Sequence, residues 1–154
     1  TTSSMQAAQS SFISSTNWTD NVGPTAAIAT IKKYQRENVA GHIKKIGKSV
    51  QSMWIDSASV AGIKIQVSGI PTLAGFQFSD GNSIRKNTIF TRECLQYGVL
   101  GFRQFKASFA HSAADLSYYR DVLNSVFHHI ATDPSALDID TPIHHTGFKR
   151  LTQE

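Results

Sequence analysis

An apolar stripe between residues 39 and 54 constrains the fold more than any other feature of this sequence. Its members recur at intervals of three or four residues and end on an adjacent pair: Val39, Ile43, Ile46, Val50, Met53 and Trp54. This spacing places them on one face of a helix with 3.6 residues per turn. We therefore expect a helix from about Asn38 to Ser57 that buries this face against the rest of the domain.

The remainder of the chain predicts helices and short strands in alternation. In chain order we expect a helical turn at 4–9, a helix at 25–35, a break near 37–38, strands at 63–67 and 73–78, a helix at 84–97, one or two short strands within 99–110, and a helix from 112 to about 132. Gly69 to Pro71 has the composition of the turn between the first two strands. Ser112 and Asp115 have the spacing of a capping box. The order indicates an α+β fold, with helices packed on a small, mainly antiparallel sheet.

Four parts follow from this pattern. Residues 1–22 are too irregular to close a core and read as the end of a larger domain, and residues 23–57 form connecting helices. Residues 58–132 form the small α+β domain, and residues 133–154 form an extended C-terminal tail.

Composition narrows the classes of function. Apolar content of 40% and charged content of 17% are those of a globular fold. No apolar run approaches the ~20 residues that span a bilayer, so we expect no membrane partner. The net charge of +4 comes from lysines and arginines on helix faces without interleaved aromatic residues, which argues against a nucleic-acid partner. The single cysteine, Cys94, excludes an internal disulfide and fits the cytoplasm.

Motifs that could carry chemistry by themselves are weak. Gly47-Lys48-Ser49 resembles the end of a phosphate-binding loop, but His42 stands where the preceding glycine is required and the segment lies within the expected helix. The histidines include two adjacent pairs and no His-x-x-x-His spacing, so we expect no metal site. Cys94 is expected to face the core from a helix. The residues alone therefore offer no catalytic constellation, which agrees with an enzyme fragment or with a binding or assembly domain.

A series of segments, in order along nearly the whole chain, resembles the class III pyridoxal-phosphate-dependent aminotransferases related to glutamate-1-semialdehyde aminomutase. The segments are Phe12-Ile13-Ser14-Ser15-Thr16 followed by Gly23 and Thr25–Thr30, Val67–Pro71, Tyr97–Leu100, Ser108–Ser112 with Asp115, and Ile143–Leu151. Each segment is weak alone, and the assignment depends on their collinearity.

The resemblance implies a fold-type I enzyme with a two-domain subunit that works as a homodimer. Pyridoxal 5'-phosphate binds in the large domain near the subunit interface, and the substrate is an amino acid or an amino ketone. Residues 1–22 would then be the end of the large cofactor domain, and residues from about Ile63 onward the small C-terminal domain. The lysine that forms the Schiff base lies in the family shortly before the segment that matches residues 1–16. No residue here takes its place, so no catalytic residue is assigned and the chain alone is expected to be inactive.

The resemblance also bears on the roles of four residues. Thr16, with Ser15 beside it, matches a residue that contacts the cofactor phosphate of the neighbouring subunit; the alternative is an ordinary turn hydroxyl. Arg103 stands where the aminomutase branch has an acidic residue. A guanidinium there would pair with a substrate carboxylate; the alternative is a plain surface arginine. His111 is expected to be a structural residue beside a helix cap.

Three functions remain open at this point. The first is an enzyme fragment that belongs to an aminotransferase or aminomutase. The second is a non-catalytic dimerisation or binding module that keeps the same fold. The third, and most distant, is a basic nucleic-acid-binding domain, which a steep dependence of binding on salt would reveal.

Overall fold

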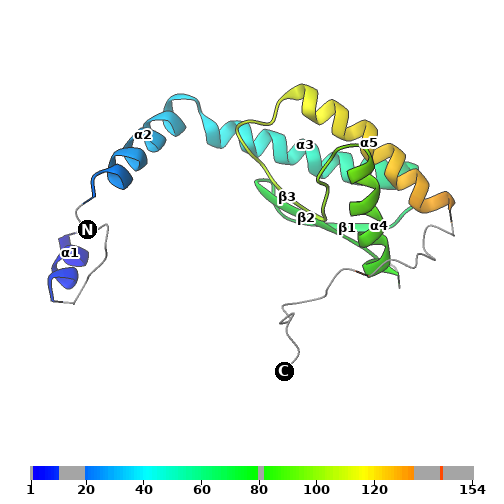
Figure 1. Cartoon of the computed structure of the whole chain (residues 1–154), viewed down its shortest axis with the longest axis horizontal. Helices are drawn as coiled ribbons and strands as arrows, with labels where there is room; N and C mark the ends of the chain where they lie inside the picture. The colour runs from blue at the N-terminus through cyan, green and yellow to red at the C-terminus, as the bar shows by residue number, and fades with distance from the viewer. Residues whose placement is uncertain (1, 11–19, 80–81, 134–142, 144–154) are drawn as a thin grey trace. The chain divides into compact units, whose positions relative to one another are not determined.

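The structure is a computed structural model, and it describes residues 2–10, 20–79, 82–133 and 143 (Figure 1). It divides into two compact units, residues 1–39 and residues 40–154, which we describe separately. The domain boundaries expected from the sequence stay predictions. Within the described ranges, no helix is both long enough and apolar enough to cross a membrane.

The first unit contains two helices, α1 (Thr2–Gln9) and α2 (Val22–Arg36), and neither has a buried side chain. Helix α2 begins at Val22, three residues before the start expected from the sequence. Just before the N-cap residue Asn21, the Asp20 carboxylate accepts a hydrogen bond of 2.9 Å at its Oδ1 from the N–H of Val22. The expected break after α2 is confirmed at Asn38, whose φ of 47° is left-handed.

The second unit begins with α3 (Val39–Val60), the helix that the apolar stripe predicts. Its inner face buries Ile46, Val50, Met53, Trp54 and Ala58. At Gly47 this helix lies directly against the turn that follows β1 (Ile65–Ile70), since a Cβ there would stand 1.7 Å from the carbonyl oxygen of Pro71. Gln51 adds a hydrogen bond of 3.3 Å from its Nε2 to the carbonyl oxygen of Gly69. Helix and hairpin are therefore packed backbone to backbone.

Three antiparallel strands form the sheet in the order β1, β2 (Leu73–Phe78), β3 (Gln104–Lys106). The β1–β2 ladder runs from Ile65 opposite Phe78 to Ile70 opposite Leu73. The turn between them is thus a two-residue connection, Pro71 and Thr72. The turn expected at 69–71 is correct for Pro71 and wrong for Gly69 and Ile70, which belong to β1. Gly69 stays in the ladder opposite Ala74 with a φ of 86°, a conformation open to glycine.

Alternate residues of β2 point toward the helices. Ala74, Phe76 and Phe78 are buried, whereas Gln77 between them is exposed. The sheet therefore has one covered face, which is the arrangement that the sequence predicts. Only one short strand, β3, forms within 99–110, where one or two were expected.

Two further helices complete the unit. Helix α4 (Ser83–Gln96) is followed by Gly98, whose φ of 69° confirms the expected left-handed end. Helix α5 (Ala113–Thr132) begins with the expected capping box: the N–H of Asp115 donates to Ser112 Oγ at 3.2 Å, and the N–H of Ser112 donates to Asp115 Oδ2 at 2.8 Å. The expected C-terminal tail lies outside the described residues except at Asp133, which caps α5, and at Ile143.

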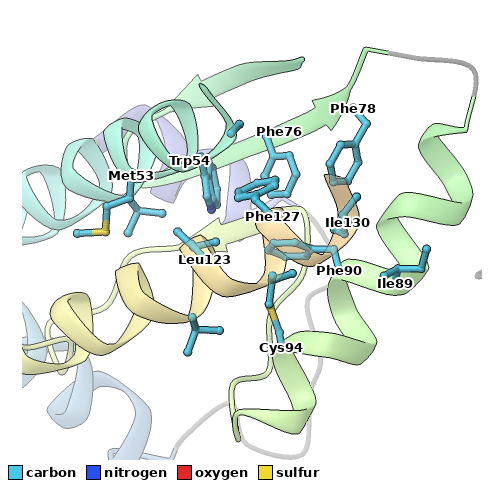
Figure 2. Packing of buried hydrophobic residues seen from close by; sticks show 14 of the residues in the cluster. Met53, Trp54, Phe76, Phe78, Ile89, Phe90, Cys94, Leu123, Phe127 and Ile130 are labelled. Atoms are coloured by element: carbon cyan, nitrogen blue, oxygen red, sulfur yellow. The ribbon is translucent and has the colours of Figure 1, made fainter. Parts of the chain in front are cut away.

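An aromatic cluster joins these elements into one core (Figure 2). The ring of Phe76 lies 5.0 Å from that of Trp54 on α3, 5.1 Å from that of Phe90 on α4 and 5.9 Å from that of Phe127 on α5, measured between centroids. These tilted and edge-to-face contacts add to the burial of area. Ser57 on α3 also donates a 2.7 Å hydrogen bond to Asn124 Oδ1 on α5.

Candidate functional site

A cavity lies beside the first turns of α5. Its volume is about 720 Å³, and its walls come from residues 98–102, residues 104–106 and His111 together with four side chains of α5. The four are Asp115, Leu116, Tyr118 and Tyr119.

The segment that forms one wall of this cavity is held in place at both of its ends. After α4 the N–H of Val99 returns to the carbonyl oxygen of Cys94 at 3.0 Å, and a Cβ on Gly101 would stand 2.6 Å from Cys94 Sγ. Further on, the carbonyl oxygen of Arg103 accepts a hydrogen bond of 2.9 Å from the N–H of Phe76. The segment is thus pinned to α4 at one end and to β2 at the other.

Cys94 makes the contacts at the α4 end of this segment. Its side chain is fully buried, so the prediction that it faces the core from a helix is confirmed. Burial, with a smaller contribution from the Glu93 carboxylate, raises the pKa of the Cys94 thiol to about 12. Since only the thiolate is a strong nucleophile, this residue is a packing element.

The raised pKa of Cys94 predicts a loss of stability in alkali. The unfolded thiol loses its proton near its ordinary pKa of 9.0, whereas the folded thiol keeps it up to about 12. The stability that the protonated Cys94 thiol contributes is therefore complete below pH 9 and is lost as the pH rises from 9 to 12. Urea unfolding at pH 7 and pH 10 measures this loss, which we expect to be smaller in Cys94→Ala. Equal losses in the two proteins would contradict the assignment.

Arg103 is half-buried next to the cavity. Its guanidinium carbon lies 5.7 Å from the centroid of the Phe102 ring, a cation–π arrangement, and Phe102 itself lines the cavity. Among the described residues no carboxylate pairs with Arg103. The side chain is thus held by an aromatic ring and keeps its donors for another group, but the substrate role expected for Arg103 stays a prediction.

His111 and His42 tie the loop before α5 to α3. The Nε2–H of His42 donates to the carbonyl oxygen of His111 at 3.1 Å, and the His42 ring meets that of Phe109 edge-on at 5.1 Å. His111 Nδ1 accepts a hydrogen bond of 3.0 Å from the N–H of Ser108, and its ring lies 5.0 Å from that of Phe105. These contacts agree with a structural role for His111. That His111 also lines a cavity is not evident from the sequence.

The structure describes only some of the other residues that the sequence singled out. Thr16 and Ser15 lie outside the described residues, so their phosphate role stays a prediction. Gly47 is buried inside α3 and Lys48 lies on the exposed side of the same helix, an arrangement that agrees with the rejection of a phosphate-binding loop. In the part of the chain that the structure describes, no three side chains of His, Cys, Asp or Glu gather as metal ligands.

Comparisons with known proteins give a match in fold and none in sequence. No protein-family profile and no curated protein sequence matches the chain. Among solved structures, the chain is similar to the pyridoxal-phosphate internal aldimine form of the FumI protein of Sphingopyxis sp. MTA144, with a TM-score of 0.75 and 19% sequence identity. The match covers 82% of this chain and 31% of that one, so this chain spans about a third of the length of its structural neighbour.

This likeness concerns the fold. The chain has the α+β architecture of one part of a pyridoxal-phosphate-dependent enzyme, with helices on one face of a three-stranded antiparallel sheet. The fold class expected from the sequence is thereby confirmed. At 19% identity, the type of reaction does not follow from the match.

Proposed function

We propose that this chain is the C-terminal part of a cytoplasmic, homodimeric, class III pyridoxal-phosphate-dependent aminotransferase or aminomutase, which moves the amino group of an amino acid or amino ketone. One observation carries the proposal: a fold shared over 82% of the chain with part of a pyridoxal-phosphate protein, at a TM-score of 0.75. The order of the family-like segments from Phe12 to Leu151 supports the narrower assignment.

The cofactor, when bound, supplies an electron sink for the carbanion that forms at the amine-bearing carbon. In this proposal the chain contributes binding groups. The hydroxyls of Ser15 and Thr16 fit a phosphate chemically, because each donates a hydrogen bond to an anionic oxygen. Arg103 fits a substrate carboxylate, and its cation–π contact with Phe102 restricts its position. The Schiff-base lysine belongs to another part of the protein.

Amino-group transfer by the complete protein tests this proposal. With pyridoxal phosphate and a panel of amino donors and keto-acid acceptors, we expect either a new amino acid or the migration of an amino group within one molecule. Liquid chromatography with mass detection distinguishes the two products. A complete protein that binds the cofactor and yields neither product would contradict the assignment to aminotransferases and aminomutases.

Replacing Arg103 with Ala in the complete enzyme should raise KM about 10- to 100-fold for a substrate that carries a carboxylate, because a charge-assisted hydrogen bond contributes about 1.5–3 kcal/mol. Turnover at saturation should change much less. Arg120→Ala is the matched control, since Arg120 is exposed on α5 and does not line the cavity. An unchanged KM for Arg103→Ala would show that Arg103 is a plain surface residue.

The alternative is a non-catalytic dimerisation or binding module. Its support is the self-contained core of the second unit, in which α3, α4, α5 and the sheet enclose a continuous cluster of buried side chains. Such a module would show no covalent capture of pyridoxal phosphate in any form of the protein, whereas the enzyme requires it.

A further inference from the structure

The cavity beside α5 has an apolar wall. Its volume of about 720 Å³ falls within the ~300–1,000 Å³ of small-molecule sites. Val99, Phe105 and Leu116 line it and also pack against the buried core, which makes this wall rigid. Leu100 and Phe102 line it as well and remain 87% and 41% exposed. An apolar group of moderate size could therefore pack against the rigid wall and cover the two exposed side chains.

His111 adds a fixed hydrogen-bond donor. Because its Nδ1 accepts the N–H of Ser108 at 3.0 Å, the neutral ring carries its proton on Nε2. Among the described residues nothing accepts a hydrogen bond from this Nε2–H. The Phe105 ring, 5.0 Å away between centroids, restrains the orientation of the imidazole. His111 therefore brings an oriented and unused donor to the cavity lining.

Tyr119 and Lys106 add two more donors. The indole N–H of Trp54 donates to Tyr119 Oη at 3.0 Å, so this hydroxyl oxygen already accepts a bond. Burial raises the pKa of Tyr119, so its hydroxyl keeps the proton, and no described residue accepts it. The ammonium of Lys106, on β3, likewise has no carboxylate partner among the described residues.

The carboxylate in the cavity lining is already hydrogen-bonded. Asp115 is the one carboxylate that lines the cavity in the described part of the chain, and its Oδ2 already accepts from the N–H and the hydroxyl of Ser112, both at 2.8 Å. Its negative charge is also offset by the positive end of the α5 helix dipole. The lining therefore offers an anion the Lys106 ammonium and the His111 Nε2–H, while its carboxylate is already engaged by Ser112.

From this pairing of unused donors with an apolar wall, we propose that the cavity binds a small carboxylate that carries an apolar body. The carboxylate lies near Lys106 and His111, and the body packs against Phe105 and Leu116. The inference does not rest on the function proposed above.

A titration with hydrocinnamate tests the proposal on the complete 154-residue chain. Its neutral amide, hydrocinnamamide, is the matched probe, because it keeps the ring and lacks the charge. Amide resonances in the NMR spectrum should shift saturably within 98–106 and the first turns of α5, together with the indole N–H of Trp54. We expect the amide to bind about tenfold more weakly, since a charge-assisted bond is replaced by a neutral one. Equal affinities, or shifts confined to other elements, would overturn the proposal.

Two lysine variants sharpen the test. Lys106→Gln should weaken hydrocinnamate binding about tenfold and leave hydrocinnamamide binding unchanged. Lys48→Gln makes the same change of charge on the exposed side of α3, away from the cavity lining, and should alter neither affinity. If both variants weaken hydrocinnamate equally, the attraction comes from net charge and the proposal is wrong. It is also wrong if Lys106→Gln has no effect.

Discussion

Replacing Phe76 with Ala should lower the free energy of unfolding by about 3–5 kcal/mol, because the substitution leaves a cavity at the centre of the core. The Phe76 side chain is 1% exposed, and its ring contacts rings on α3, α4 and α5 as well as that of Phe78. Among the ring–ring contacts of the described residues, only those of Phe76 reach rings on all three helices. A loss of this size is a large part of the stability of an ordinary domain.

Urea unfolding followed by far-UV circular dichroism measures this loss. Phe102→Ala is the control, because it removes the same side chain from a position that is 41% exposed, and should cost less than about 1 kcal/mol. Equal losses in the two variants would mean that Phe76 is not the centre of the core.

Replacing Gly47 with Ala should lower the free energy of unfolding by about 2 kcal/mol or more. The added Cβ would stand 1.7 Å from the carbonyl oxygen and 2.3 Å from the carbonyl carbon of Pro71, so α3 and the hairpin must move apart. Overpacking of this kind costs ~1–3 kcal/mol or more, and a contact with backbone has little room to relax. The higher helix propensity of Ala offsets at most about 1 kcal/mol of this loss in the free energy of unfolding.

Ser52→Ala is the matched control for this substitution. Ser52 lies on the exposed side of the same helix, so the change should stay within about 0.5 kcal/mol of the parent protein. The same urea titration serves both variants. If Gly47→Ala is as stable as the parent, α3 does not pack against the hairpin as described.

Local patterns explain which elements the sequence predicts well. The stripe from Val39 to Trp54 correctly predicts a helix, which buries the stripe from Ile46 to Trp54 and leaves Val39 and Ile43 half-buried. The Ser112–Asp115 box correctly predicts a helix start. The hairpin turn was misplaced because Gly69 and Pro71 both read as turn residues. Pairing of Gly69 with Ala74 keeps that glycine in the strand, and only the partner strand reveals this.

Features that depend on distant residues were not predictable. The buried Trp54 indole meets Tyr119, 65 residues further along the chain, and the contact of Gly47 with Pro71 joins a helix to a turn. The cavity arises where the chain after α4 passes the start of α5, so its donors come together only in the folded chain. Arg103 was singled out by resemblance, whereas Tyr119, which lines the cavity, was missed.

The location of the cofactor lysine decides whether this chain is one part of a larger pyridoxal-phosphate enzyme. Pyridoxal phosphate is added to the complete protein and to the 154-residue chain, each mixture is reduced with borohydride, and modified lysines are mapped by peptide mass spectrometry. We predict stoichiometric capture at one lysine of the complete protein, outside residues 1–154, and no stoichiometric site in the chain alone. Stoichiometric capture at a lysine within residues 1–154, or none in the complete protein, would contradict the account.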